Sequence, residues 1–419
     1  MANNNENKIL NVPNLRFPEF CGEWETIKVS ELLDFYSTNS LSWEQLDYSN
    51  GKIKNLHYGL IHKGVPTMVD VACDSLPYIK EESMLKSFTL FKEGDVAFAD
   101  ASEDTNDVAK AIEVVNCDNQ QIVSGLHTIH GRDNSNRTVI GYKGYAFASD
   151  SFHKQIRRIA QGTKVFSISV RNFDEAYIGI PSKEEQTQIA KLLITIDKRI
   201  ATQNKIIEKY ESLIKGLNDS LYAQYGDDVL TSFSSLGFSY SGLSGKSAQD
   251  FGSGKPFITY LNVYSNNIIN EEDFQYVAIK EGEKQNVVEY GDVLFTLSSE
   301  TPEEVGIGSV YLGNENVYLN SFCFGIHIIN TKIAFPPYLS YYVSSTPFRK
   351  FIYPYAQGST RFNLCKVDFE KASIKLPSLE NQKRIYSILS HIESKTETEK
   401  SLLDLYNSQK QYLLRQMFI

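Results

Sequence analysis

Ala160-Gln161-Gly162-Thr163 in the first half of the chain returns 196 residues later as Ala356-Gln357-Gly358-Ser359. Upstream, Gly94-Asp95-Val96 matches Gly291-Asp292-Val293 with one more residue of offset. The step of 196 also relates Phe166/Phe362, Ile178/Ile374, Pro181/Pro377, Ser182/Ser378, Glu184/Glu380, Gln186/Gln382, Ile189/Ile385, Leu193/Leu389, Ile196/Ile392 and Tyr210/Tyr406. This period is too long for a solenoid, whose repeats span about 20–50 residues. The sequence therefore predicts two homologous domains that do one thing at two places.

Each half ends in a long helical pattern. Pro181-Ser182-Lys183-Glu184 and Pro377-Ser378-Leu379-Glu380 each supply a proline, a serine cap and an acidic first turn, which signal a helix start. Apolar residues follow at spacings of three and four over about 40 residues, so each helix would be about 60 Å long. Stripes of this length favour a coiled coil over two separate surface helices. The polar stretch 394–399 predicts a weaker stripe or a kink in the second helix.

The remaining segments predict mixed α and β structure. Residues 165–170, 256–261 and 291–296 are β-branched and aromatic runs between turn residues, which is typical of short strands. Pro337–Val343 predicts a short amphipathic helix. The predicted fold class is α+β, with two homologous mixed α/β domains separated by two long antiparallel coiled-coil helices in a pseudo-two-fold arrangement. The predicted parts are a disordered tail (1–14), a first domain (15–181), a first helix (182–226), a second domain (227–377) and a second helix (378–419).

Positive charge gathers at matching places in an acidic chain. The net charge of −9 argues mildly against nucleic acid as a partner. However, residues 123–183 hold nine basic and four acidic side chains, and residues 342–376 hold six and two. Each basic segment precedes a terminal helix, so a shared anionic ligand is as good an interpretation as a solvated surface. The candidate cationic contacts are Arg132, Arg137, Lys154, Arg157 and Arg158 in the first half, and Arg349, Lys350 and Arg361 in the second.

Several patterns associated with catalysis or cofactors fail on inspection. Gly245-Lys246-Ser247 resembles the end of a phosphate-binding loop, but Tyr240 occupies the position of the required glycine. Phe335-Pro336-Pro337-Tyr338 resembles a motif of amino-methyltransferases, but Phe335 cannot accept a hydrogen bond from the amine. No glycine-rich loop follows a strand in a way that would hold S-adenosylmethionine. His127 and His130 lack a metal-ligand pattern. The sequence therefore predicts no catalytic apparatus and no metal in this chain.

Composition indicates where the protein works. The chain contains no run of about 18 apolar residues, so no transmembrane helix is expected. Its first residues lack the apolar core of a signal peptide. Five cysteines are scattered and odd in number, at positions 21, 73, 117, 323 and 365. This usage fits a reducing compartment and argues against a disulfide framework, so a cytoplasmic location is expected.

Taken together, several stretches resemble the specificity subunit of type I restriction-modification systems. These are Leu15-Arg16-Phe17-Pro18-Glu19-Phe20 with Glu23-Trp24, Tyr240–Ser247, Gly291–Thr296, Ala356–Asn363 and the Pro-Ser-x-Glu-x-Gln opening of both helices. The resemblance covers essentially the whole chain. The first half departs from the family pattern, because Lys164-Val165 occupies the positions equivalent to Thr360-Arg361. A base contact by Arg361 would therefore have no counterpart in the first half.

The resemblance implies a non-enzymatic DNA sequence-recognition subunit. Each half would be a target-recognition domain followed by a spacer helix, and the two domains would read a bipartite site in double-stranded DNA. Two copies of a methyltransferase subunit would dock on the helices, and restriction subunits would join that complex. This chain would bind no cofactor, since S-adenosylmethionine belongs to the methyltransferase, and ATP and Mg²⁺ belong to the restriction subunit. A coiled-coil adaptor that reads no bases and a self-contained DNA methyltransferase are the alternatives.

The repeated Gly-Thr and Gly-Ser loops are the predicted places of base reading. A short polar loop on a glycine turn beside a strand can enter a DNA groove, although such a turn can also merely close a domain. The candidate residues are Gln161, Thr163 and Lys164 in the first half, and Gln357, Ser359, Arg361 and Asn363 in the second. Lys246, in the family-like stretch 240–247, is a further candidate for DNA contact.

Overall fold

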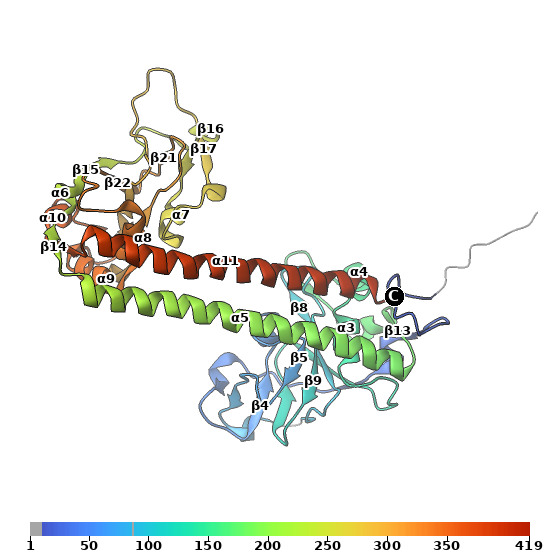
Figure 1. Cartoon of the computed structure of the whole chain (residues 1–419). Helices are drawn as coiled ribbons and strands as arrows, with labels where there is room; N and C mark the ends of the chain where they lie inside the picture. The colour runs from blue at the N-terminus through green and yellow to red at the C-terminus, as the bar shows by residue number, and fades with distance from the viewer. Residues whose placement is uncertain (1–10, 86–87) are drawn as a thin grey trace, which may run out of the picture. The chain divides into compact units, whose positions relative to one another are not determined.

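The computed structural model describes residues 11–85 and 88–419. Within these ranges the chain forms two compact units (Figure 1). The first contains the described residues up to Asn204 together with Ser401–Ile419, and the second contains Lys205–Lys400. Each unit combines one mixed α/β domain with segments of two long helices, α5 (Lys183–Tyr225) and α11 (Leu379–Gln416). This confirms the predicted fold class of two homologous mixed domains with long helices between them.

Two mixed sheets form the domain of the first unit. The larger sheet has the strand order β2 (Asp34–Tyr36), β11 (Thr128–Arg132), β7 (Val96–Ala99), β9 (Ala111–Asn116) and β5 (Met68–Asp70). The smaller has the order β10 (Gln121–Ser124), β4 (Ile53–Leu56), β6 (Tyr78–Ile79) and β3 (Leu46–Asp47). Two further pairs are β1 (Glu25–Lys28) with β13 (Tyr177–Ile180), and β8 (Ala101–Ser102) with β12 (Phe166–Ser167). Among the strands described in this unit, β5–β9 and β10–β4 pair in parallel and the other pairs are antiparallel.

Short helices cover these sheets and connect their strands. They are α1 (Val29–Leu32), α2 (Tyr58–His62), α3 (Tyr142–Phe147) and α4 (Asp150–Ile159), with 3₁₀ turns η1 (Trp43–Gln45), η2 (Glu82–Met84) and η3 (Val170–Asp174). The described part of the predicted tail begins at Asn11, whose carbonyl accepts a hydrogen bond from the Trp24 amide. Residues 1–10 of that predicted tail lie outside the described residues.

The second unit has smaller sheets with a related layout. Its main sheet has the order β15 (Gly237–Ser241), β22 (Cys323–Ile328), β18 (Val293–Thr296) and β20 (Gly308–Val310). The other sheets are β17 (Gln275–Val277), β16 (Phe251–Ile258) and β21 (Tyr318–Leu319), then β19 (Ser298–Ser299), β24 (Phe362–Leu364) and β23 (Ala356–Gln357), and the pair β14 (Val229–Thr231) with β25 (Ile374–Leu376). The helices are α6 (Phe233–Leu236), α7 (Tyr260–Ser265), α8 (Pro336–Ser344), α9 (Thr346–Ile352) and α10 (Lys366–Lys371), with 3₁₀ turns η4 (Ala248–Asp250), η5 (Glu271–Asp273), η6 (Pro302–Glu304) and η7 (Tyr353–Tyr355).

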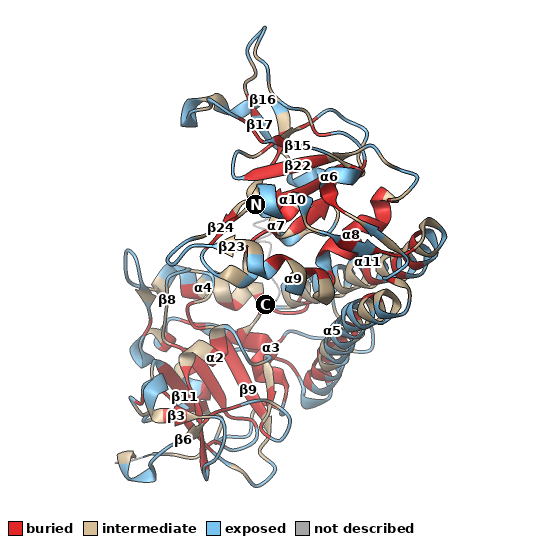
Figure 2. Cartoon of the chain, turned by 90° about the vertical axis from the view of Figure 1, so that its left-hand side faces the viewer, coloured by how far each residue is buried: buried red, intermediate tan, exposed pale blue. Residues whose placement is uncertain are grey.

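Much of the apolar stripe of each long helix is buried in the core of the units (Figure 2), although Leu213 of α5 and Ile388 of α11 are exposed. In the first unit, Leu193 of α5 and Leu413 of α11 belong to the same cluster as Phe98. In the second, Leu389 of α11 belongs to the cluster against which Leu217 of α5 packs. The helix segments within the first unit run antiparallel, because Asp197 pairs with Lys410 while Arg199 lies over the Tyr406 ring, further back along α11. Burial of these stripes explains why the helices persist over such lengths.

Four local predictions need correction in whole or in part. Of the predicted strand 165–170, only Phe166–Ser167 is extended, and η3 begins at Val170. The predicted strand 256–261 ends at Ile258, because the Thr259 side chain accepts a hydrogen bond from the Asn262 amide and starts α7. Helix α8 forms as predicted but is not amphipathic, since Pro336–Val343 are all buried. The polar stretch 394–399 does not interrupt α11.

Candidate nucleic-acid interface

The repeated glycine loops are the tips of two equivalent hairpins. In the first unit β12 pairs with β8, and Gln161 bridges to Ser167. In the second, β24 pairs with both β19 and β23, which joins Gln357 to Asn363. Gly162 and Gly358 have φ of +139° and +145°, and a Cβ there would lie 1.9 and 2.1 Å from a carbonyl across the turn. Only glycine fits such a position without distortion, which explains why both loops contain it.

The hairpin tips gather exposed polar side chains in each domain. Thr163 and Lys164 in the first tip, and Ser359 and Arg361 in the second, are all exposed. Gln161, Gln357 and Asn363 at the bases of the hairpins are exposed as well. The Arg361 guanidinium lies close to Tyr260 at the start of α7: burial raises the pKa of this tyrosine, and Arg361 acts in the opposite direction. The structure thus groups these predicted base-reading residues by domain, on short loops with free polar atoms.

Helices α4 and α9 precede the hairpins and carry the basic residues predicted beside them. Both start at an equivalent serine, since Ser149 and Ser345 accept hydrogen bonds from the amides three residues on. Basic residues lie in the last turn of each helix, where they complement its partial negative charge. In α4, Lys154 pairs with Asp150 within the helix, Arg157 donates to Asn106, and Arg158 is exposed.

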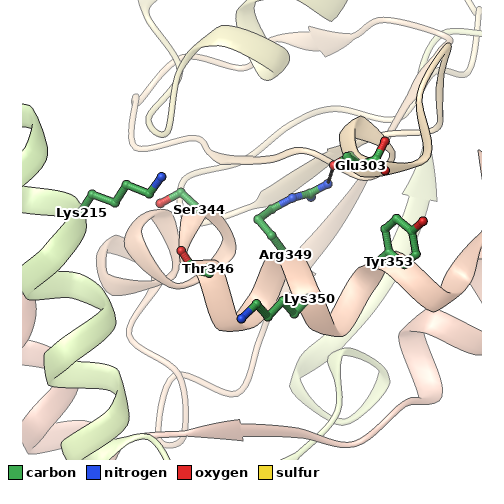
Figure 3. Close-up of a pocket in the computed structure, with 7 residues that line it drawn as sticks. All are labelled: Lys215, Glu303, Ser344, Thr346, Arg349, Lys350 and Tyr353. Atoms are coloured by element: carbon green, nitrogen blue, oxygen red, sulfur yellow. Dashed lines mark hydrogen bonds between the residues drawn. The ribbon is translucent and has the colours of Figure 1, made fainter.

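In α9 the two basic residues differ in their surroundings. The Arg349 guanidinium donates to the carbonyls of Glu303, Val305 and Gly306 at 2.7 Å each, and burial lowers the pKa of Arg349. It therefore closes the loop before β20 instead of projecting outward. Lys350 is exposed and lines a cavity of about 360 Å³ beside Lys215, Ser344 and Tyr353 (Figure 3).

Three other predicted cationic contacts use their charge within their own domains. Arg132 forms two hydrogen bonds with Asp95, at 2.8 and 2.7 Å, and one with the Leu90 carbonyl. Arg137 pairs with Glu25. The Lys246 side chain is only 6% exposed and contacts Glu283 at 2.6 Å and the Ala278 carbonyl. These geometries indicate structural roles, and none of the three joins the hairpin tips.

A buried aspartate anchors the main sheet of each domain, at the repeated Gly-Asp-Val. His130 and Arg132 bind Asp95, whereas Tyr240 and His327 bind Asp292. Burial would raise the pKa of Asp95, but its hydrogen bonds with Arg132 and His130 hold it below the ordinary value. Burial raises the pKa of Asp292. The sequence repeat indicated these two aspartates but not their partners, because the partners lie on strands that are far away in the sequence.

A buried glutamine at the start of each long helix fixes the helix to its domain. Gln186 accepts from the Val139 amide and donates to the carbonyls of Pro181 and Arg137. Gln382, 196 residues on, accepts from the Phe335 amide and donates to the carbonyls of Pro377 and Ile333. Both side chains are fully buried. The sequence marked these glutamines as a repeat but gave no sign that they bind main-chain atoms.

A second hydrogen bond attaches each domain to its long helix, about three helical turns after the glutamine. The Tyr145 hydroxyl donates to Asp197 at 2.7 Å, and the Tyr341 hydroxyl donates to Glu393, again at a step of 196. Burial, then the neighbouring carboxylate, raises the pKa of both tyrosines, so both hydroxyls remain protonated donors. Each polar hairpin is thus carried by a domain that is hydrogen-bonded to its own long helix at two levels.

The described residues offer no assembled metal centre. Over 11–85 and 88–419, no three His, Cys, Asp or Glu side chains come together in a way that could hold a metal ion. Within the same ranges, no helix is both long and apolar enough to cross a membrane. What recurs in both units is a polar hairpin on a domain that is hydrogen-bonded to its long helix.

Comparisons with known proteins agree with this layout. A model of the type I restriction modification DNA specificity domain matches residues 22–212 and 244–405. The S subunit of a type I restriction-modification system from M. genitalium has a similar fold, with a TM-score of 0.53 at 14% identity, over 97% of this chain and 99% of that one. A chain from a study of assembly and conformational transition of the type I R-M system gives 0.58 at 14% identity, over 93% and 96%.

A search of curated protein sequences finds no match. The family match nevertheless covers most of both halves. It falls on the two segments that are defined by the internal repeat, the hairpins and the glutamine joints, that is, the buried Gln186 and Gln382 with their main-chain partners. The structural likeness spans nearly the whole length of the chains compared. The chain belongs to the family of type I restriction-modification DNA specificity proteins, with two copies of the specificity domain, and acts in DNA sequence recognition.

Proposed function

We propose that this chain is the non-catalytic specificity subunit of a type I restriction-modification complex and reads a bipartite DNA site, one half-site by each domain. The observation that carries this proposal is the repeated hairpin: both copies share a glycine turn and its strand pairing, but their tips carry different polar residues. A shared scaffold with different tips fits two domains that contact DNA in the same way and read different bases.

The exposed cations divide into two roles. Arg157, Arg158 and Lys350, at the ends of α4 and α9, would contact phosphates and position each domain on the duplex. Lys164 and Arg361 at the hairpin tips would reach base edges, where an arginine can bind guanine through two hydrogen bonds. Arg132, Arg349 and Lys246 would act indirectly, because their charged groups bind partners within their own domain and so stabilise its fold.

The long helices would provide the ruler and the docking surface. Helix α5 begins in the first unit and ends in the second, and α11 does the reverse, so both helices connect the two domains. Two copies of a methyltransferase subunit would bind along them, and restriction subunits would join that complex. S-adenosylmethionine would be bound by the methyltransferase, and ATP and Mg²⁺ by the restriction subunit. The target base would be flipped into the methyltransferase, which leaves this chain with recognition alone.

Mapping methylated bases by single-molecule sequencing tests this function. A host that expresses this chain with a methyltransferase partner should show methylation at one bipartite sequence with a fixed gap. The same host without this chain should show none. Replacing residues 228–376 with the matching domain of a relative should change one half-site and leave the other and the gap intact. Methylation without sequence preference, or a change in both half-sites on domain replacement, would contradict the proposal.

A further inference from the structure

Beside each hairpin, one exposed side chain occupies an equivalent place but differs completely in chemistry. His127 and Phe322 both lie in the turn that leads into the second strand of the main sheet, β11 and β22 respectively. Strand register establishes the equivalence, because the next residue, Thr128 or Cys323, pairs with Ala99 or Thr296, which lie 197 apart. The 196-residue repeat does not reveal this pair, since the local offset here is 195.

Identical hydrogen bonds hold the two positions next to the hairpins. The Asp100 amide donates to the His127 carbonyl, and the Ile168 amide donates to the Asp100 carbonyl. In the second domain the Leu297 amide donates to the Phe322 carbonyl, and the Leu364 amide donates to Leu297. Ile168 directly follows β12, and Leu364 is the last residue of β24; these are the strands that return from the hairpin tips. Each side chain therefore stands two strand spacings, about 10 Å, from its hairpin, within the reach of one major groove about 12 Å wide.

The structure of the first domain orients a polar group at this position. His127 adopts a left-handed backbone conformation with φ of +52°, which is rare outside glycine and concentrates at functional sites. Its side chain is 52% exposed, and its Nδ1 lies 3.1 Å from Asp100 Oδ1. The Tyr58 ring contacts the imidazole edge-on. With Nδ1 directed at the carboxylate, Nε2 on the other side of the ring is the atom available to a ligand.

The second domain presents an apolar group at the same place. Phe322 is 57% exposed, and its backbone neighbour Leu297 replaces the aspartate that orients His127. Both members of the pair have thus changed character together, from Asp100 with His127 to Leu297 with Phe322. An isolated exposed phenylalanine is ordinary on a protein surface. Phe322, however, lies at the position that the first domain fills with an oriented histidine.

We propose that His127 and Phe322 are specificity-determining residues: His127 forms a hydrogen bond with a base edge in one half-site, and Phe322 contacts the 5-methyl group of a thymine in the other. A phenyl ring cannot form directional hydrogen bonds with base edges, but apolar contact with the thymine methyl is an established means of direct readout. This inference rests on the proposed function and names two residues that carry it out.

Three variants of the chain, assembled with a methyltransferase partner, test the proposal. His127→Asn removes the imidazole with a residue that tolerates positive φ, and Phe322→Ala removes the ring. Phe238→Ala is the matched control, because Phe238 is also 57% exposed and lies about 16 Å along the same strand pair. Methylated sites should become degenerate at a base pair of one half-site for His127→Asn, and of the other half-site for Phe322→Ala. The control should keep the wild-type site.

Binding measurements on the second half-site identify the methyl contact. Replacing one thymine by deoxyuridine should weaken binding of the wild-type complex about fourfold, since one methyl group is lost from an apolar contact. Phe322→Ala should bind both DNAs equally. Unchanged sites in both variants, a second half-site without an A·T pair, or an undiminished effect of deoxyuridine in Phe322→Ala would overturn this inference and leave the proposed function standing. A wild-type complex that methylates without a bipartite preference would overturn both.

Discussion

Replacing Gln186 with leucine tests whether the buried amide fastens the first domain to its helix. Leucine keeps the side-chain volume but leaves the Val139 amide and the carbonyls of Pro181 and Arg137 without their partner, at a fully buried position. At about 1 kcal/mol for each lost hydrogen bond, the free energy of unfolding should fall by about 3 kcal/mol. For a unit of this size, that corresponds to a decrease in Tm of about 6–12 °C.

Thermal unfolding of the whole chain, followed by circular dichroism, measures this effect. Gln188→Leu is the matched control, because Gln188 lies two residues further along α5 and is exposed, and its Tm should stay within about 2 °C of the wild type. At a temperature where Gln186→Leu remains folded, its complex should methylate the wild-type site, since the joint contacts no base. Equal Tm values for the two variants would refute the idea that these hydrogen bonds hold the joint. A changed recognition sequence would contradict its separation from base reading.

Three further predictions concern DNA. Arg157→Ala with Arg158→Ala should weaken DNA binding of the complex and reduce its salt dependence by about one unit of log–log slope for each lost phosphate contact, so an unchanged slope would place both residues away from DNA. Arg361→Ala should relax one half-site, where an arginine bound to guanine contributes about 1–3 kcal/mol of discrimination; equal loss at every site without new sites would make it a positioning residue. Four residues inserted after both Asn204 and Lys400, where the units divide both helices, should widen the gap between half-sites by about two base pairs, since each helix gains about 6 Å. One residue inserted at each place should instead impair assembly, because it rotates the apolar stripe by about 100°. Mapping of methylated sites checks both insertions. An unchanged gap in the active four-residue variant would show that the helices do not set the distance between the half-sites.

The long helices and the duplication were predictable because both are written in local or periodic signals. Ser182 caps α5 through the Glu185 amide, and Ser378 does the same for α11, as the proline-serine pattern indicated. The middle of α11 was harder to predict, because its polar residues suggested a break. Thr396 is nevertheless buried, and its hydroxyl donates to the Ile392 carbonyl, so the helix continues through a stretch that lacks apolar residues.

The candidate site was only partly predictable, because charge in a sequence does not reveal direction in a structure. Arg349 and Lys350 are neighbours with the same charge, yet one binds three carbonyls from a loop more than 40 residues away and the other is exposed. Arg132 meets Asp95 only because β11 and β7 pair. The equivalence of His127 and Phe322 depends on strand register, which the sequences of the two turns do not display.

The glutamine joints bind only main-chain atoms, and this affects how the two domains can diverge. Gln186 and Gln382 recognise an amide and two carbonyls, groups that remain in place when the side chains around them change. A domain with a different sequence can therefore attach to its helix with the same geometry, provided its backbone follows the same path. These glutamine contacts do not depend on the side chains of the domain, whereas base reading by the loops does. New recognition sequences can therefore arise without a change in how the domain is attached to its helix.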